Sequence, residues 1–376
     1  MLLECGNCYS GQMMNKMTFL AFLTAICCLG GFASDINAPS LENIATSLNT
    51  SINSVQLTMT LYFTGFSLSQ LIYGPLTDSI GRQKPLLFGV ALFLISSIIA
   101  SLSPQVEVLM LARLFQGLGA GATGCIWRAM FLDHYDQKEI VVYSSYLQMF
   151  ILFALPSAPL IGGFLDTHVS WSAPFVFMSI YALFCLFLIT LLPEKPLKKP
   201  LPFNIKTLTT QYWKIISHPV FLRYIMCASA SYGIFISWFF VGKAFTQLPS
   251  DDFGLYCFLT SCPAIYIASQ TNKRFIHKLG ADKMIQLGFS LTIIGSSIVL
   301  ISQALSLPPL LFLAFFLIVI GSMIIPACTF SKAFEPFEKT TGTTAGIYGS
   351  LQQLGGFIIG LGITLLPEST HTHTLS

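Results

Sequence analysis

Two charged residues, Asp35 and Arg113, lie inside stretches of sequence that are otherwise almost entirely apolar. A helix rises about 1.5 Å per residue, so Asp35 lies far from the start of its stretch, and Arg113 reaches a similar depth if its own helix runs in the opposite direction. An isolated charge in a bilayer costs roughly 2.5–3.5 kcal/mol on insertion scales, and a neighbouring opposite charge offsets part of that cost. We therefore expect Asp35 to bind and release a proton, with Arg113 as its partner. In the alternative, Asp35 only ends its helix ahead of Pro39.

The elements that position these two charges are predicted to be membrane-spanning helices. Hydrophobic residues make up 54% of the 376 residues and charged residues 9%, whereas about a quarter of the residues in soluble domains are charged. The apolar residues form continuous blocks of about 20 residues, the length that crosses about 30 Å of hydrocarbon as a helix. We predict an all-α integral membrane protein with eleven spans, at about residues 18–38, 54–76, 85–103, 107–131, 141–164, 172–193, 219–242, 252–271, 282–303, 308–329 and 341–366.

The positive charges outside these spans fall almost entirely on one side of the predicted membrane. They are densest in the longest connection, and they recur in the connections on the same side, whereas the opposite connections are mainly acidic. Because Lys and Arg accumulate in cytoplasmic loops, we expect the N-terminus and the longest connection to be cytoplasmic. The predicted divisions are a tail at 1–17, a six-helix bundle at 18–193, a linker at 194–218, a five-helix bundle at 219–366 and an extracytoplasmic tail at 367–376.

The composition excludes several other classes of function. The net charge of +3 is small and scattered, so it forms no continuous basic surface of the kind that nucleic acid requires. Cys5 and Cys8 have no second cysteine pair to complete a four-ligand zinc site, and we predict no metal. No histidine belongs to a recognisable catalytic set with a serine or cysteine. We therefore predict that the protein is not an enzyme and needs no cofactor.

A segment rich in glycine and charge joins the second and third predicted spans. Gly74 and Gly81 allow close approach and a tight turn, because glycine adopts backbone conformations that are closed to other residues. Asp78 and Arg82 lie four residues apart, and Arg82 is also within reach of Asp133 at the end of another span. Charges placed in this way can pair in one conformation and separate in another, so we predict a cytoplasmic gate. A solvated turn whose charges only set the topology is the alternative.

Two motifs resemble signatures of the major facilitator superfamily. Residues 74–84, Gly-Pro-Leu-Thr-Asp-Ser-Ile-Gly-Arg-Gln-Lys, resemble the signature between helices 2 and 3 of that family, although Gln83 stands where a second cation is usual. Residues 111–120, Leu-Ala-Arg-Leu-Phe-Gln-Gly-Leu-Gly-Ala, look like the helix 4 motif, in which Gln116 and Gly117 are the signature positions. The first motif has the position in the chain that the family requires, just after the second span.

A third motif resembles the export-associated sequence of helix 5. It occupies residues 158–163, with alanine in place of the first glycine, and its signature residues are Pro159, Gly162 and Gly163. Small residues at these positions allow helices to pack closely. Residues 34–41 and 66–78 further resemble the Bcr/CflA branch of bacterial drug-resistance transporters. The connection at 279–283 faintly repeats the one at 80–84, as two related halves would.

The resemblance implies two bundles of six helices and drug:proton antiport out of the cytoplasm, across the inner membrane of a bacterium. We expect a monomer in the lipid bilayer whose substrate is a small amphipathic or aromatic molecule. The chain departs from the family because it ends where a twelfth helix would begin. The alternatives are a proton-coupled transporter of a metabolite such as an amino acid, and a truncated remnant that does not transport. The predicted cavity residues are Tyr62, Phe66, Tyr146, Tyr232, Trp238 and Tyr348.

Overall fold

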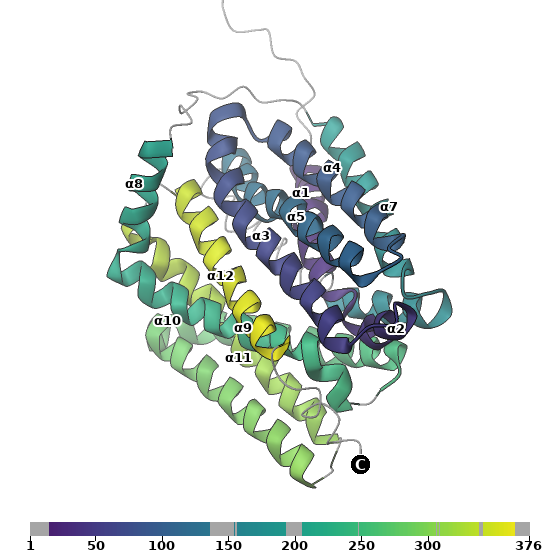
Figure 1. Cartoon of the computed structure of the whole chain (residues 1–376). Coiled ribbons are helices and arrows are strands. Elements are labelled where there is room, and N and C mark those ends of the chain that lie inside the picture. Colours follow the sequence, from purple (N-terminus) through teal and green to yellow (C-terminus); the bar gives the residue numbers. More distant parts are fainter. Residues whose placement is uncertain are drawn as a thin grey trace, which may run out of the picture.

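The computed structural model of the chain describes residues 15–135, 154, 156–192, 205–246, 248–305, 307, 309–337 and 341–364. These residues form helices joined by short connections, and no strand occurs among them, which confirms the predicted all-α fold (Figure 1). The first helices are α1 (Lys16–Asp35), α2 (Leu41–Ser47), α3 (Ile52–Ile80), α4 (Gln83–Ser101), α5 (Val106–His134) and α7 (Ala173–Thr190). Residues 156–168 form a further helix. The later helices are α8 (Ile205–Ile216), α9 (Pro219–Thr246), α10 (Ser250–Leu305), α11 (Pro309–Phe334) and α12 (Thr341–Thr364), and two short 3₁₀ helices are η1 (Ala38–Ser40) and η2 (Glu335–Phe337).

Several helix starts follow from the residues found there. Ser51 precedes α3, and its hydroxyl oxygen accepts a hydrogen bond from the backbone N–H of Ser54 at 3.2 Å. This contact satisfies one of the backbone donors that every helix leaves open at its first turn. Pro219 and Pro309 are the first residues of α9 and α11. Proline is favoured there because its missing N–H would have had no partner and its φ angle already suits a helix.

Among the described residues, seven helical stretches are long and apolar enough to cross a membrane. The helix α3 is not among them, although its 29 residues exceed the length required. The reason is a set of polar side chains that α3 buries against protein and that lower its hydropathy: Gln56, Thr60, Ser67 and Gln70, each at most 2% exposed. A helix surrounded by other helices needs less apolar surface than one that faces lipid. The predicted membrane-spanning class therefore holds.

Glycines break the helices at two corresponding points. The spans predicted at 252–271 and 282–303 are the two helical parts of α10, which are separated by a kink at Gly280 with φ 75° and ψ 165°. Gly81, between α3 and α4, has nearly the same conformation, with φ 94° and ψ 171°. Only glycine adopts this region of φ and ψ readily. The faint repeat noted between 80–84 and 279–283 therefore has a structural counterpart.

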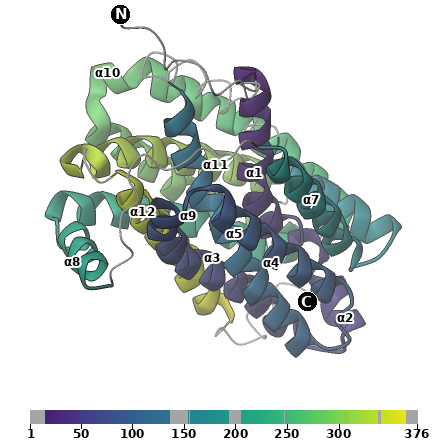
Figure 2. The ribbon, with the colours of Figure 1, turned by 90° about the horizontal axis from the view of Figure 1, so that it is seen from above.

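The helices pack in two groups that meet along α3 and α12. Helices α1, α3, α4, α5 and α7 pack on one another, and α9, α10, α11 and α12 do the same. The most extensive contact between the groups is that of α12 with α3, and these two helices lie side by side in both views (Figures 1 and 2). In this contact, the Ser67 hydroxyl donates a hydrogen bond to the backbone oxygen of Ser350 at 2.8 Å. The seam between the groups is therefore closely packed around Ser67.

Two helices were not predicted from the sequence. α2 follows directly on η1 and occupies part of the first connection. α8 occupies the second half of the linker at 194–218, a segment whose prolines and lysines favoured an irregular connection. Its apolar residues nevertheless recur at helical spacing, at Ile205, Leu208, Tyr212 and Ile215. That spacing is typical of a helix with one apolar face.

Candidate functional site

Arg113 lies in the middle of the first helix group and is 1% exposed. Its Nη1 atom donates to the backbone oxygen of Ala33 on α1 at 3.0 Å and to Oε1 of Gln116 at 2.5 Å. Nε2 of Gln116 in turn donates to the hydroxyl oxygen of Ser97 on α4 at 2.8 Å. The guanidinium is thus held by three helices, α1, α4 and α5. The motif residue Gln116 is part of this support.

The ring of Tyr62 supports the same guanidinium from α3. The Cζ atom of Arg113 lies 4.4 Å from the centre of the Tyr62 ring and 5.9 Å from that of Phe175 on α7. The Tyr62 hydroxyl donates to the backbone oxygen of Gly30 at 2.6 Å, which fixes the ring against α1. A cation over an aromatic face is stabilised by about 0.5–2 kcal/mol, with the larger values where water is excluded. Tyr62 therefore contacts the predicted partner of the proton carrier directly.

Asp35 is the last residue of α1 and is 6% exposed. Its Oδ1 atom accepts a hydrogen bond from the Ser34 hydroxyl at 2.6 Å. Asp35 and Arg113 lie within electrostatic range of each other, but no ion pair within 4.0 Å joins them in the described part of the chain. The Arg113 contact to α1 is instead to the carbonyl of Ala33, two residues before the carboxylate. The two predicted residues are brought together as neighbours.

Two side chains of the second helix group lie near enough to Asp35 to feel its charge. Tyr232 on α9 and Cys257 on α10 both lie within electrostatic range of it. The ring of Tyr232 also meets Phe63 of α3 edge to face, with the ring centres 6.2 Å apart. A movement of one helix group against the other would therefore change the surroundings of the Asp35 carboxylate.

The predicted gate is described only in part. Gly81 has the conformation that only glycine adopts readily, and a Cβ at Gly74 would lie at an ordinary 3.7 Å from Sγ of Cys125. Arg82 donates from Nη1 to the Thr77 hydroxyl at 2.7 Å. The side chains of Asp78 and Asp133 lie outside the described part of the structure. Their pairing with Arg82 stays a prediction.

The residue that breaks the gate motif, Gln83, has a role in packing. Its Nε2 atom donates to the backbone oxygens of Ile189 and Leu192, at 3.0 and 3.3 Å. These are carbonyls at the end of α7, where a helix leaves its last acceptors without internal partners. The amide of Gln83 therefore joins the start of α4 to the end of α7 by hydrogen bonds. A neutral donor is sufficient for these bonds, so a second cation is not needed at this position.

Glycines of the helix 4 and helix 5 motifs lie where backbones meet. A Cβ at Gly117 would collide with the carbonyl of Tyr62, so α3 and α5 touch through their main chains. A Cβ at Gly162 would collide with the carbonyl of Ile36, and one at Gly163 with that of Ser250.

The second helix group contributes to the same junction. Gly254 of α10 packs in the same way on the carbonyl of Pro159. The Ser250 hydroxyl donates to the backbone oxygen of Pro39 at 3.0 Å. The helix at 156–168 is thus wedged between the end of α1 and the start of α10.

The predicted cavity residues fall into separate places. Tyr62 and Phe66 are buried neighbours on α3, with ring centres 5.8 Å apart. Trp238 instead stacks on Phe315 of α11 at 4.6 Å. The hydroxyl of Tyr348 lies 2.9 Å from that of Thr329, also on α11. Tyr146 lies outside the described residues. Tyr232 contacts the ring of Phe63, the residue that follows Tyr62 on α3.

A second intramembrane cation, Arg128, was missed by the sequence analysis. It belongs to the same apolar stretch as Arg113, and its Nη1 atom lies 3.5 Å from the position that a Cβ would occupy at Gly349 of α12. Arg128 also lies within electrostatic range of Tyr348 and Cys27. A charged residue inside an apolar span is a signal of function by itself. A search of every apolar span for charged residues would have identified Arg128.

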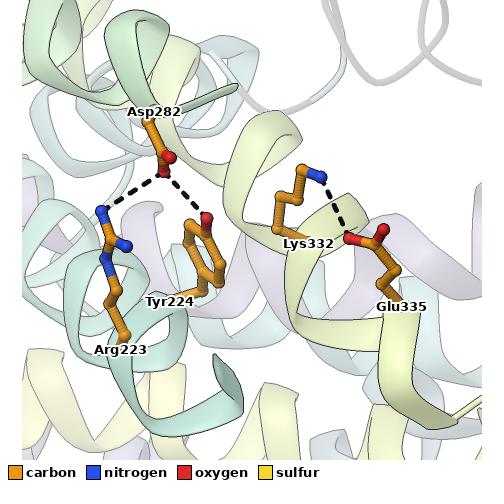
Figure 3. A network of polar contacts seen from close by, with 5 residues as sticks. All are labelled: Arg223, Tyr224, Asp282, Lys332 and Glu335. Atoms are coloured by element: carbon orange, nitrogen blue, oxygen red, sulfur yellow. Dashed lines mark hydrogen bonds and ion pairs between the residues drawn. The ribbon is translucent and has the colours of Figure 1, made fainter. Parts of the chain in front are cut away.

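A polar network lies near the linker, at the end of the second helix group (Figure 3). Asp282 Oδ1 accepts from the Tyr224 hydroxyl at 2.8 Å and lies 3.5 Å from Nη2 of Arg223, which ties the start of α9 to α10. Lys332 and Glu335 pair at 3.0 Å beside a pocket of about 410 Å³ between α9 and α11. These side chains are largely exposed, so water and salt screen both pairs and they contribute little to stability.

Comparison with known proteins gives consistent results. A family model described as Major Facilitator Superfamily matches residues 20–360. Multidrug resistance protein D of Escherichia coli is 29% identical, over 95% of this chain and 91% of that protein. Bicyclomycin resistance protein homolog of Haemophilus influenzae is 26% identical, over 92% of this chain and 89% of that protein.

A solved structure shares the fold. The crystal structure of a D-xylose-proton symporter superposes with a TM-score of 0.75 at 15% identity, and the match covers 95% of this chain and 92% of that one. The family model spans both helix groups and includes every motif that carried the resemblance. On the combined evidence of motifs, fold and sequence similarity, this chain belongs to the major facilitator superfamily.

Proposed function

We propose that this protein exports drugs or other small amphipathic molecules across the bacterial inner membrane, driven by protons that move in the opposite direction. Membership of the superfamily makes it a multi-pass membrane transporter of a small molecule and not an enzyme. Relatives named for resistance to multiple drugs, bicyclomycin and chloramphenicol support export. The observation that supports proton coupling is the buried carboxylate of Asp35 beside Arg113, at the seam between the helix groups.

The proposed arrangement in the membrane follows the charge distribution. Residues 18–193 and 219–366 are the two bundles, and the linker at 194–218 and the N-terminus are cytoplasmic, because positive charges gather on that side. The protein acts as a monomer, with the substrate path at the seam where α3 and α12 meet. Alternating access then consists of a rocking motion of one bundle against the other.

In the proposed coupling step, Asp35 takes up a proton from the outer side and releases it on the inner side. Nη2 of Arg113 has no hydrogen-bond acceptor among the described residues, so the guanidinium retains a donor for the Asp35 carboxylate in a conformation that brings the two together. Approach of the two groups favours the charged carboxylate and loss of the proton, and separation favours the protonated form. Each pH unit of gradient supplies about 1.4 kcal/mol and each charge moved through 100 mV about 2.3 kcal/mol.

The aromatic residues nearest to this pair suggest the type of substrate. Tyr62 and Phe66 on one side of the seam and Tyr232 on the other present ring faces and edges within the protein interior. Flat apolar molecules bind to such surfaces by stacking and by exclusion of water. When the two bundles move apart, a polar group of the substrate would reach the hydroxyls of Ser67 and Ser350, which bond to each other across the closed seam.

The decisive test of the coupling site is Asp35→Asn in proteoliposomes. We expect loss of the proton movement that substrate addition induces, because the amide cannot carry a proton, while substrate still binds. Asp252→Asn is the matched control, because Asp252 is an exposed carboxylate at the start of α10, and we expect normal coupling. Proton-coupled transport that survives Asp35→Asn would place the carrier elsewhere.

The direction and type of substrate are tested by a resistance panel in a host that lacks its own efflux pumps. Expression should raise resistance to several amphipathic drugs, and a protonophore should remove that resistance. Uptake of an amino acid or other metabolite without any resistance would instead support an importer.

A further inference from the structure

The helix α8 is attached to both helix groups by one of its faces. The Tyr212 hydroxyl donates a hydrogen bond to the backbone oxygen of Leu71 on α3 at 2.7 Å. Ile215, one turn further along the same face, is only 2% exposed. α8 also packs on α9 and α12 of the second group. It therefore lies across the seam between the two groups, on the linker side.

The opposite face of α8 is directed away from the protein. Thr209, Thr210, Trp213 and Lys214 are exposed on it, and Trp213 is 74% exposed, which is unusual for so large an apolar ring. In both overall views α8 lies at the periphery of the molecule (Figures 1 and 2). Tryptophan on an outward face of a membrane protein is enriched at the level of the lipid headgroups, where its ring and its N–H are both accommodated.

The position of α8 in the chain places it at that level. Two residues, Ser217 and His218, separate it from α9, which begins a membrane span at Pro219. α8 thus remains close to the plane at which that span leaves the hydrocarbon. Its apolar face packs on the protein at Tyr212 and Ile215, so only the face that carries Trp213 and Lys214 is available to lipid.

The charge of this segment selects the type of lipid. α8 carries Lys206 and Lys214 and no acidic residue, and no Asp or Glu occurs anywhere from residue 195 to residue 250. The cytoplasmic leaflet of a membrane has a negative surface potential from its anionic lipids, which attracts basic residues next to a span. Together, the exposed indole, the lysines and the depth of α8 favour an anionic phospholipid headgroup as the partner of this face.

We propose that the face of α8 formed by Thr209, Thr210, Trp213 and Lys214 binds anionic phospholipid headgroups. Bound lipid holds α8 in the interface, and the Tyr212 hydrogen bond transmits that constraint to α3 at the seam. Transport therefore depends on the anionic lipid content of the membrane. The proposal rests on the cytoplasmic location given above for the linker.

The location of Trp213 is tested by fluorescence quenching in vesicles that contain phospholipids brominated at different depths. The emission that disappears in Trp213→Phe belongs to Trp213. We expect bromines close to the headgroup to quench this difference signal most strongly. Quenching by aqueous iodide with no effect of any brominated lipid would overturn the proposal, and would leave α8 as a surface in water that a soluble protein could cover.

The lipid dependence is tested by drug transport in vesicles of phosphatidylcholine with increasing phosphatidylglycerol. We expect the wild-type rate to rise with the anionic fraction. In Lys214→Gln the fraction needed for half of that rise should increase about fivefold, the equivalent of about 1 kcal/mol for one lysine near an anionic surface. Lys283→Gln, which removes an exposed lysine outside α8, is the matched control and should respond as the wild type does.

The outcomes separate this proposal from the proposed function. If transport is normal but independent of phosphatidylglycerol, the lipid proposal is wrong and export stands. If no drug is transported in any membrane while Trp213 is quenched at headgroup depth, the lipid site stands and the proposed function is wrong. Equal responses of Lys214→Gln and the wild type would overturn the assignment of the lipid to α8.

Discussion

The guanidinium of Arg113 is held by a line of contacts that runs from the Ala33 carbonyl through Gln116 to Ser97. Each contact depends on the one before it, because Gln116 offers its oxygen to arginine and its nitrogen to serine. A buried donor that loses its partner is costly, by about 1–3 kcal/mol and more for a charged group. Gln116 is therefore expected to matter more for stability than its terminal partner.

We predict that Gln116→Leu lowers the free energy of unfolding by about 1–3 kcal/mol, because it removes one of the two acceptors of Arg113 Nη1 in a site closed to water. Ser97→Ala is the matched control: it removes the bond from Gln116 and the bond from the Ser97 hydroxyl to the Phe93 carbonyl but leaves every contact of Arg113 in place, so we expect it to cost less than Gln116→Leu. Thermal unfolding in detergent, followed by tryptophan fluorescence, gives the order of the two variants. A larger loss in Ser97→Ala than in Gln116→Leu would show that the line of contacts does not support Arg113.

The sequence allowed the prediction of side chains whose type is unusual for their surroundings. Asp35 and Arg113 stood out because charge is rare inside apolar spans, and the structure places them as buried neighbours. Ser34 and Ser97 could not be found in this way, because serine is common in such spans and its contacts depend on how helices meet. The Ala33 carbonyl has no signal at all, since every residue carries one.

At the scale of the element, Gly81 and Gly280 set the turns between α3 and α4 and within α10. A Cβ at either residue would find nothing within 4 Å, so space does not require glycine there. The requirement comes from the backbone, because a positive φ with ψ near 170° is closed to residues with a side chain. The matching conformation of the two glycines agrees with the faint sequence repeat between 80–84 and 279–283.

We predict that Gly81→Ala and Gly280→Ala each destabilise the fold by about 1–3 kcal/mol, the usual cost of this backbone region for other residues. Gly362→Ala is the control: its Cβ would also find nothing within 4 Å, but Gly362 lies in the helix α12 without a positive φ. That variant should be neutral or more stable by up to about 1 kcal/mol, because alanine favours helices. Equal melting temperatures for all three variants would contradict the backbone argument.

Elements were predicted well where a long apolar block was present and poorly where it was not. The spans of α4 and α7 were recognised because each is apolar on all sides, and the span of α5 because its few charged residues lie within a long apolar block. α8 was missed because its apolar residues alternate with Lys and Thr, and its prolines upstream suggested an irregular linker. A test for helical spacing inside the linker would have found it.

At the scale of the whole molecule, orientation is the property that the proposed function depends on most. We predict that Gln105→Cys, between α4 and α5, reacts with an impermeant maleimide in intact cells, whereas Lys278→Cys reacts only after permeabilisation. Both positions are exposed, and the variants carry serine in place of Cys5 and Cys8 so that the tail does not react. Labelling of both sites from the same side would contradict the proposed topology.

The junction of residues 156–168 with α1 and α10 has a consequence for how such a protein evolves. Gly162 and Gly163 rest on the carbonyls of Ile36 and Ser250, and Gly254 rests on that of Pro159. Every amino acid carries the same carbonyl, so this junction is insensitive to which side chains line the seam. In the proposed transporter, mutations of the aromatic residues that would contact substrate could alter which compounds are recognised without a compensating change where the backbones meet. Selection by a new antibiotic can therefore act on recognition alone, while the mechanical parts of the transporter are inherited unchanged.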